Sequence, residues 1–450
     1  MTDPLLETGD SVQDRPHYLR RVTDMAERCS VVTQDAIYSE SGIKLVEKGA
    51  CIDSRLYDRL VQHKLREPLD THLSVANAVN MESLQQAVRQ MLESEPLPLL
   101  LRKALGDAQP LLEPLRSLPL TPPVAFKLTV LREQMPDLFL HSLQMMLVAL
   151  YLGVRSGLEP HQLTSLAAAG LLHDLGTLHM DPTWRDPSHK VTGPSRKHLV
   201  AHPITSMLLV REAGVYGRAV EVAVLEHHER MDGSGYPRGL AGQDISPMGQ
   251  ILLLSVLVTA FYEKYLDSPA QQLSLVLRLN HRKFPAPLVA HVLPLLTEES
   301  NAQSSRALPQ GEQIHSLADQ LAKAFVQWEQ AKSQWSQGGG HAADLGPFAY
   351  VEEGLQALKR ALTEAGAHPD HHTVLLEHLQ GDEQGLAELA YVLREALWQL
   401  EHIVFGCQRR WHAELEQGSS PGAVAAAQWC GCRAPALGPS LQRSGVAGAA

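Results

Sequence analysis

The sequence predicts a mainly α-helical protein with a helical bundle domain in its middle, a small β-containing module before it and further helices after it. Only 5% of the 450 residues are aromatic, while 44% are hydrophobic and 20% charged, which favours helices rich in Leu and Ala over β-sandwiches. Apolar residues recur at helical spacing through most of the chain. Because one hydrophobic core rarely serves a chain of this length, we expect two or three folded units.

The N-terminal module is predicted to span residues 1–75 and to combine strands with a helix. Residues 30–52 are rich in β-branched and apolar residues around two turns, at Ser41-Gly42 and Lys48-Gly49, as in short strands joined by tight turns. Asp53 then precedes apolar residues at helical spacing and is a good N-cap. A helical connector is expected at 76–123, with helices at 81–91 and 98–105 and a proline-rich end.

The rest of the chain is expected to be helical up to a disordered tail. The central domain, 124–300, is predicted to hold six helices separated by loops rich in Pro, Gly and Asp, at 124–134, 136–156, 160–175, 197–213, 217–229 and 247–264. After it we expect a polar linker with a helix, a helical accessory segment and a disordered tail rich in Gly, Ala, Ser and Pro, at 301–345, 346–416 and 417–450.

Composition excludes some classes of function. The net charge is −11 and the chain has no Lys/Arg-rich run, so nothing indicates binding to nucleic acid. The N-terminal residues lack the basic and apolar regions of a signal peptide, and the longest apolar run, 251–262, is too short to span a bilayer. The five cysteines form no pair of zinc knuckles. We therefore expect a cytoplasmic protein with reduced thiols and no membrane insertion.

The chain has 22 histidines, and those predicted at helix ends are the strongest indication of a chemical site. His173 and Asp174 end an apolar helix, and further imidazoles lie on other helices at His141, at His202 and in a histidine pair at 227–228. A single His-Asp pair of this kind more often caps a helix. For the whole set, the alternative to metal binding is that these histidines are buried, hydrogen-bonded residues of the core. Imidazoles with a bridging carboxylate are, however, what a hydrolytic metal centre requires.

Three motifs resemble a known family: HDLG at 173–176, HP at 202–203 and HHERMDGSGYPRGL at 227–240 are similar to the HD-GYP subclass of HD phosphohydrolases. The resemblance implies an HD-type helical bundle over the central domain. It gives His173 and Asp174 the catalytic positions, and it assigns the loop at 235–237, for which the family is named, to the substrate. The implied metal ligands are His141, His173, Asp174, His202, His227 and His228, and the implied substrate-binding residues are Gly235, Tyr236 and Pro237. Asp137, one helical turn before His141, is a further candidate metal ligand, and Arg238 is a candidate substrate-binding residue that could contact a phosphate.

The family's activity implies the function we expect. It is the hydrolysis of cyclic di-GMP to linear pGpG or to GMP in bacterial second-messenger signalling, assisted by one or two divalent transition ions, iron or manganese. Glu229 and Asp232 are candidates to orient metal ligands through hydrogen bonds.

Two departures from the family pattern keep other hypotheses open. Thr177 stands where the family has a lysine that helps to hold phosphate, and Val256 and Thr259 stand where it has aspartates, the first of which closes one metal position. One tightly bound ion is therefore favoured over two. The alternatives are a catalytically degenerate domain that senses the nucleotide or scaffolds signalling-protein partners, and a phosphohydrolase for another phosphate ester. The connector helices are the hypothesised surface for a homodimer.

Overall fold

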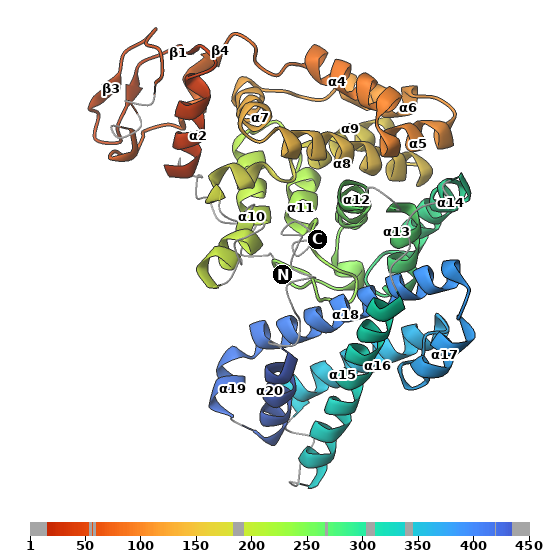
Figure 1. The fold of residues 1–450 in the computed structure, drawn as a ribbon. Coiled ribbons are helices and arrows are strands. Elements are labelled where there is room, and N and C mark those ends of the chain that lie inside the picture. Colours follow the sequence, from red (N-terminus) through yellow and green to blue (C-terminus); the bar gives the residue numbers. More distant parts are fainter. Residues whose placement is uncertain are drawn as a thin grey trace. The chain divides into compact units, whose positions relative to one another are not determined.

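The computed structural model describes residues 16–53, 56, 60–182, 193–265, 269–302, 311–337, 345–418 and 420–433. Helices dominate these residues (Figure 1), so the predicted mainly α fold is confirmed. The chain divides into two compact units, and each has a core of its own. The first unit contains residues 16–265 and 282–295, and the second contains residues 269–281 and 296–433.

The N-terminal module of the first unit combines one helix with two small sheets. Helix α2 (Pro16–Ala26) precedes strand β1 (Val31–Thr33), which pairs antiparallel with β4 (Leu73–Val75). Strands β2 (Ile37–Tyr38) and β3 (Lys44–Val46) form the second pair. The predicted turn between them is present, and Gly42 adopts a φ of 82° there, which only glycine adopts at little cost. The helix expected after Asp53 falls mostly outside the described residues.

Three connector helices follow this module: α4 (Met81–Ser94), α5 (Pro96–Leu105) and α6 (Gln109–Arg116). Helix α4 begins in a capping box, in which Asn80 and Ser83 satisfy each other's backbone N–H groups. Proline occupies the first turn of α5 and of α6, where its missing N–H costs nothing. All three helices lie within the residues predicted as a helical connector, 76–123.

The helical bundle occupies the rest of the first unit. Its helices start close to the predicted positions because Pro or a capping residue stands at most of their N-termini. At Gly170, a Cβ would lie 2.8 Å from the Met146 Cα, so the missing side chain allows the helices that carry these two residues to pack closely. The bundle elements are α7 (Pro122–Gln134), α8 (Pro136–Arg155), α9 (Pro160–Leu172), η2 (Leu175–His179), α10 (Gly193–Glu212), α11 (Arg218–Glu226), η4 (Gly242–Asp244) and α12 (Pro247–Lys264).

The second unit is built from helices around a core of its own. Trp328 and Trp429 are buried against each other, with ring centroids 5.7 Å apart, and the Trp429 indole donates to the Ala324 carbonyl. The elements are α13 (Pro269–Leu279), α15 (Gly311–Gln337), α16 (Leu345–Glu364), η6 (Pro369–His371), α17 (His372–His378), α18 (Glu383–Arg410), α19 (His412–Gln417) and α20 (Pro421–Arg433), while α14 (Ala286–Ala302) begins in the first unit.

Three expectations about this half of the chain need correction. Residues 421–433, expected within the disordered tail 417–450, form helix α20, because Trp429 and several alanines pack into the core. The helix expected within the polar linker at 301–345 is present as α15, but its 27 residues contribute to that core and do not form a linker. The expected end of the central domain at 300 does not match the division into units, because α13 packs on α16 and α18.

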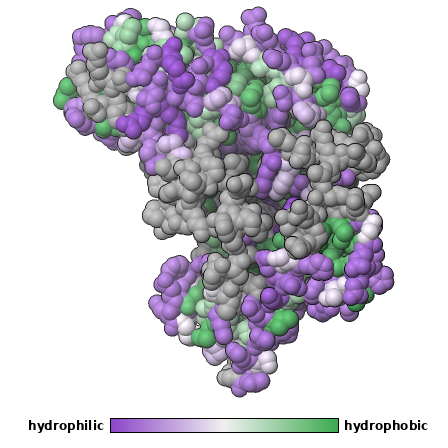
Figure 2. Space-filling view, viewed as in Figure 1, coloured by the Kyte–Doolittle hydropathy of each residue, from purple (hydrophilic) through white to green (hydrophobic). Residues whose placement is uncertain are grey.

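One helix of the described residues, α8, is long and apolar enough to cross a membrane by length and composition. However, 78% of that stretch is buried within the fold, as in the central helix of a folded core. On the face shown in Figure 2, hydrophobic residues are interspersed among hydrophilic ones over the described part of the surface.

Candidate metal centre

The predicted histidines lie where helices of the bundle end or converge. His173 ends α9 and Asp174 follows it, while His227 ends α11 and His228 follows it. His202 lies inside α10. A Cβ at Gly176 would lie 2.5 Å from the His202 carbonyl oxygen, so a glycine in HDLG is needed for η2 to approach α10.

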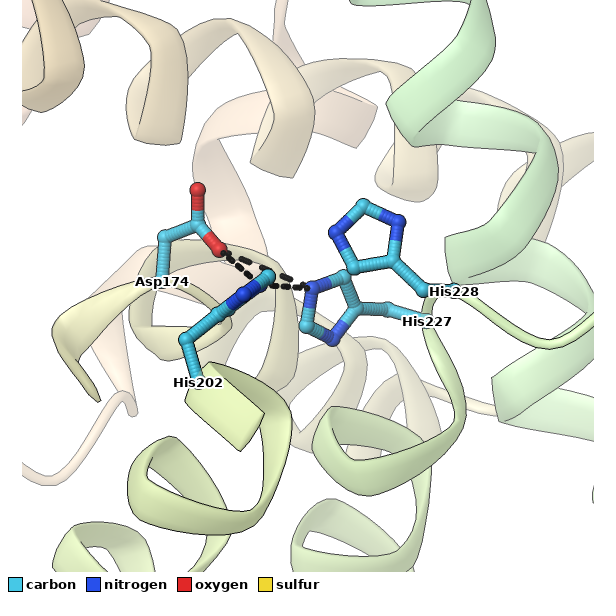
Figure 3. Close-up of side chains that lie close together, drawn as sticks. All are labelled: Asp174, His202, His227 and His228. Carbon is cyan, nitrogen blue, oxygen red and sulfur yellow. Dashed lines mark hydrogen bonds and ion pairs between the residues drawn. The ribbon is translucent and has the colours of Figure 1, made fainter. Parts of the chain in front are cut away.

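Three imidazoles and one carboxylate gather around a common point (Figure 3). The ligand atoms of Asp174, His202, His227 and His228 all lie within 4.8 Å of one another. Asp174 Oδ1 is 3.1 Å from His202 Nε2 and 3.5 Å from His227 Nε2, and these two nitrogens are 3.2 Å apart. The three histidines are buried, with at most 6% of their surface exposed.

The hydrogen bonds behind these rings fix which nitrogen is a free base. The Nδ1 atoms of His202 and His227 lie 2.5 and 2.6 Å from the carbonyls of Leu199 and Val224. A carbonyl oxygen only accepts, so Nδ1 carries the hydrogen and Nε2 keeps its lone pair. Two lone pairs and the Asp174 carboxylate thus face one another without a hydrogen between them. Such an arrangement is repulsive unless a cation occupies the point they share.

Burial holds the cluster in the protonation state that metal binding needs. It lowers the pKa of His173 to about 3, although the neighbouring Asp174 opposes this shift. Burial also lowers the pKa of His227 and, more strongly, that of His228. For the Asp174 carboxyl, burial raises the pKa, but His173 and His202 outweigh it, so the pKa lies well below its usual value. Near neutral pH the imidazoles of His173, His227 and His228 are therefore neutral, and the Asp174 carboxylate is ionised.

A second group of ligands shares Asp174 with the first. His141, His173 and Asp174 offer atoms that lie within 4.8 Å of one another, and the His173 Nδ1 faces the Gly170 carbonyl at 2.8 Å, so its Nε2 is also a free base. The structure thus brings together six of the seven predicted ligands. Asp137 is exposed on the first turn of α8 and belongs to neither group.

The donor set fits a divalent transition ion. Neutral imidazoles and carboxylates are the ligands that zinc, iron and manganese take in proteins. Backbone carbonyls behind the imidazoles of His173, His202 and His227 hold the ring orientations, as second partners of metal-bound histidines do. The first group has four ligands, enough for a closed or nearly closed site, whereas the second has three.

The loop after the two histidines lies against this cluster. The Tyr236 ring stacks on His228, with centroids 4.7 Å apart, and its N–H donates to the His228 carbonyl. A Cβ at Gly235 would collide with the backbone of Glu229 and Arg230. Of the four predicted substrate-binding residues, Tyr236 thus contacts a candidate ligand, His228, and Gly235 lies against the backbone that follows this histidine.

Two buried glutamates hold this loop in place. Glu229 accepts hydrogen bonds from the N–H groups of Arg238 and Leu240, at 2.8 and 2.9 Å. Glu226 accepts from the Arg238 guanidinium at 2.6 Å and from the N–H and hydroxyl of Ser246. The predicted supporting role of Glu229 thus concerns the loop, and the Arg238 side chain is paired with Glu226. Sequence reasoning missed Glu226, although its place directly before the histidine pair was a usable signal.

The positions that depart from the family pattern contribute no charge. The Thr177 hydroxyl donates to the Asp174 carbonyl at 2.6 Å, and the side chain is buried. Val256 and Thr259 are buried on α12. Neither ligand group of the described residues includes a residue of α12.

Comparisons with known proteins relate the central bundle to HD domains. Residues 118–278 match the family model of an HD domain. The chain is 25% identical over 142 residues to the cyclic di-GMP phosphodiesterase PdeB of Borreliella burgdorferi, which covers 30% of this chain and 37% of that protein. It is 31% identical over 114 residues to the cyclic di-GMP phosphodiesterase PA4108 of Pseudomonas aeruginosa, covering 25% and 27%.

Two further proteins show similarity. The 3'3'-cGAMP-specific phosphodiesterase 1 of Vibrio cholerae is 30% identical over 118 residues, covering 26% of this chain and 27% of that protein. A solved HDG"Y"P protein of Bdellovibrio bacteriovorus aligns with 64% of this chain and 100% of its own, at 15% identity and a TM-score of 0.34. The chain thus spans less than two fifths of the length of the curated relatives it matches.

The bundle and its cluster of histidines and aspartate define the class of the central domain, an HD domain. With the HDLG and HHERMDGSGYPRGL motifs and the similarity to these phosphodiesterases, the domain belongs to the HD-GYP family. The resemblance read from the sequence is confirmed.

Proposed function

We propose that the protein is a metal-dependent phosphodiesterase that hydrolyses cyclic di-GMP to linear pGpG or GMP. The observation that carries the proposal is the convergence of imidazole lone pairs on the ionised Asp174, beside the loop at 235–237. The printed names of the relatives, cyclic di-GMP and 3'3'-cGAMP phosphodiesterases, support a cyclic dinucleotide as the substrate class. A cytoplasmic location and signalling-protein partners remain part of the proposal.

In the proposed mechanism the chain's residues hold, orient and shield the reacting groups. Asp174, His202, His227 and His228 would hold one divalent ion, and His141 and His173 would hold another with Asp174. A bound ion supplies Lewis acidity toward the phosphodiester and toward water. The predicted catalytic pair, His173 and Asp174, lies where the two groups meet.

The loop supplies the proposed contact surface for the nucleotide. Tyr236 is partly exposed and is fixed by its stacking on His228, so it has an aromatic edge available beside the cluster. Glu229 and Glu226 keep the loop at this position through the hydrogen bonds described above. A rigid loop lowers the entropy cost of orienting a substrate. Arg238 holds the loop through its pairing with Glu226, and its contact with a phosphate of the substrate stays a prediction.

The test is turnover of cyclic di-GMP and of 3'3'-cGAMP by the purified chain, loaded without oxygen with iron or manganese. A His173→Ala/Asp174→Ala variant should lose at least roughly 10³-fold in rate, equivalent to about 4 kcal/mol of barrier. His161→Ala, an exposed histidine on α9, is the matched control and should keep the rate. Faster turnover of 3'3'-cGAMP would reassign the substrate.

A second candidate function rests on the uncharged residues that stand where the family has a lysine and two aspartates. Thr177, Val256 and Thr259 remove the groups that would meet phosphate or close a metal position, and this favours a sensor or scaffold that binds the nucleotide without turnover. Bound metal and micromolar binding of cyclic di-GMP, with no product formed, would support this candidate and reject the enzyme.

A further inference from the structure

Glu263 lies beside the metal centre although no motif contains it. It stands on the last turn of α12, and its carboxylate oxygens are 2.9 and 3.0 Å from His141 Nδ1. The His141 side chain is 9% exposed and that of Glu263 is 34% exposed. The two residues are 122 positions apart in the chain and meet because α12 packs along α8.

His141 differs from three of the other candidate histidine ligands in what orients its ring. His173, His202 and His227 each place Nδ1 against the carbonyl three residues earlier in their own helix. The His141 Nδ1 instead faces a carboxylate from another helix. An ionised carboxylate accepts only, so it holds the hydrogen on Nδ1 and leaves the Nε2 lone pair as the metal-binding atom.

Apart from Glu263, α12 has no acidic side chain that could face the ion position formed by His141, His173 and Asp174. Val256 has no donor atom, and Thr259 is fully buried with a hydroxyl that has no hydrogen-bond partner among the described residues. The ion position of His141, His173 and Asp174 therefore has three protein ligands, and the negative charge that α12 adds near it comes from Glu263. A carboxylate behind an imidazole also makes that imidazole more basic and a stronger ligand.

We propose that Glu263 is a positioning residue for this second ion: through His141 it sets whether the position formed by His141, His173 and Asp174 is occupied. The inference rests on the metal centre of the proposed function and adds a residue to it. Loss of Glu263 should weaken the second ion and leave the first, held by Asp174, His202, His227 and His228, nearly unchanged.

The experiment is a titration of the full chain with Mn²⁺, followed by metal analysis and electron paramagnetic resonance. The unaltered protein should bind two ions and give the signal of a spin-coupled pair. Glu263→Ala should weaken the second ion by roughly 10- to 100-fold and give the six-line signal of isolated Mn²⁺. Glu263→Gln keeps an acceptor oxygen for Nδ1–H and should lose less.

Two controls separate positioning from a general loss of structure. Glu93→Ala removes an exposed glutamate from α4 and should leave both affinities unchanged. In a His141→Ala background, Glu263→Ala should have no further effect on the second ion, because its route through His141 is gone.

The inference is overturned if Glu263→Ala binds two ions with unchanged affinity, if it weakens both ions equally, or if the unaltered protein binds only one. Turnover measured on the same samples separates this from the proposed function. A protein that is active with one ion would contradict the inference and leave the phosphodiesterase intact.

Discussion

Single residues set how closely the loop approaches the metal centre, and Gly235 is the clearest case. Its α-carbon lies against the backbone of Glu229 and Arg230, where a Cβ would collide. The loop therefore lies against the end of α11 only if this position lacks a side chain. Tyr236, the next residue, then donates its N–H to the His228 carbonyl.

Gly235→Ala should loosen this loop. A forced backbone shift costs typically about 1–3 kcal/mol, and amide hydrogen exchange across residues 229–240 should accelerate by roughly 5- to 150-fold as a result. Gly217→Ala is the control, because nothing lies within 4 Å of the added Cβ and its φ of −72° suits alanine. Equal exchange in the two variants would show that close approach is not what Gly235 provides.

Four of the candidate ligands could be predicted from the sequence because they form two pairs at helix ends, His173–Asp174 and His227–His228. It gave no access to Glu263, since the pairing with His141 depends on how α12 packs on α8. It also placed Asp137 near the metal because that residue lies one helical turn from His141, yet the side chain is exposed. Spacing along a helix defines a face but not the depth of the residue within the bundle.

At the scale of elements, α2 is joined to the segment that carries the HD motif. Arg21 is buried, and its guanidinium donates to the carbonyls of Leu178 and Met180 at 2.6 and 3.0 Å. Tyr18 stacks on His179, with centroids 4.7 Å apart. The N-terminal helix thereby caps the end of η2, a few residues after Asp174.

Arg21→Ala should free this end of η2. Hydrogen bonds that involve a charged group contribute about 1.5–3 kcal/mol, so amide exchange in α2 and in residues 175–180 should rise roughly 10- to 150-fold. Arg89→Ala, on the exposed face of α4, should change exchange in neither segment. Unchanged exchange in Arg21→Ala would mean that α2 is held by its apolar face alone.

Helix bounds were predictable where prolines and caps stand at helix starts, as at Pro136, Pro160 and Pro247. The tail was mispredicted for a different reason. Residues 421–433 are mostly small, so their helical period is weak, and Gly and Ser on either side suggested disorder. Their helix is stabilised by tertiary contacts, chiefly of Trp429, which local sequence does not reveal.

At the scale of the whole molecule, the chain forms two units, and the candidate metal centre belongs to the first alone. Its candidate ligands come from residues 141 to 228 on four helices, so the cluster forms only once the bundle is folded. The sequence predicted this convergence through the motifs and their family resemblance. It did not predict that α13 belongs with the C-terminal helices, because that depends on contacts between distant segments.

The account depends most on the claim that the cluster holds a divalent ion, and metal content tests it most directly. The full chain would be loaded with Fe²⁺ or Mn²⁺ without oxygen, desalted and analysed for metal beside an Asp174→Asn/His202→Ala variant and the His161→Ala control. The account predicts at least one ion per chain in the unaltered protein and the control, and at least about tenfold weaker retention in the variant. A folded, unaltered protein that keeps no ion, or a variant that keeps as much, would contradict it.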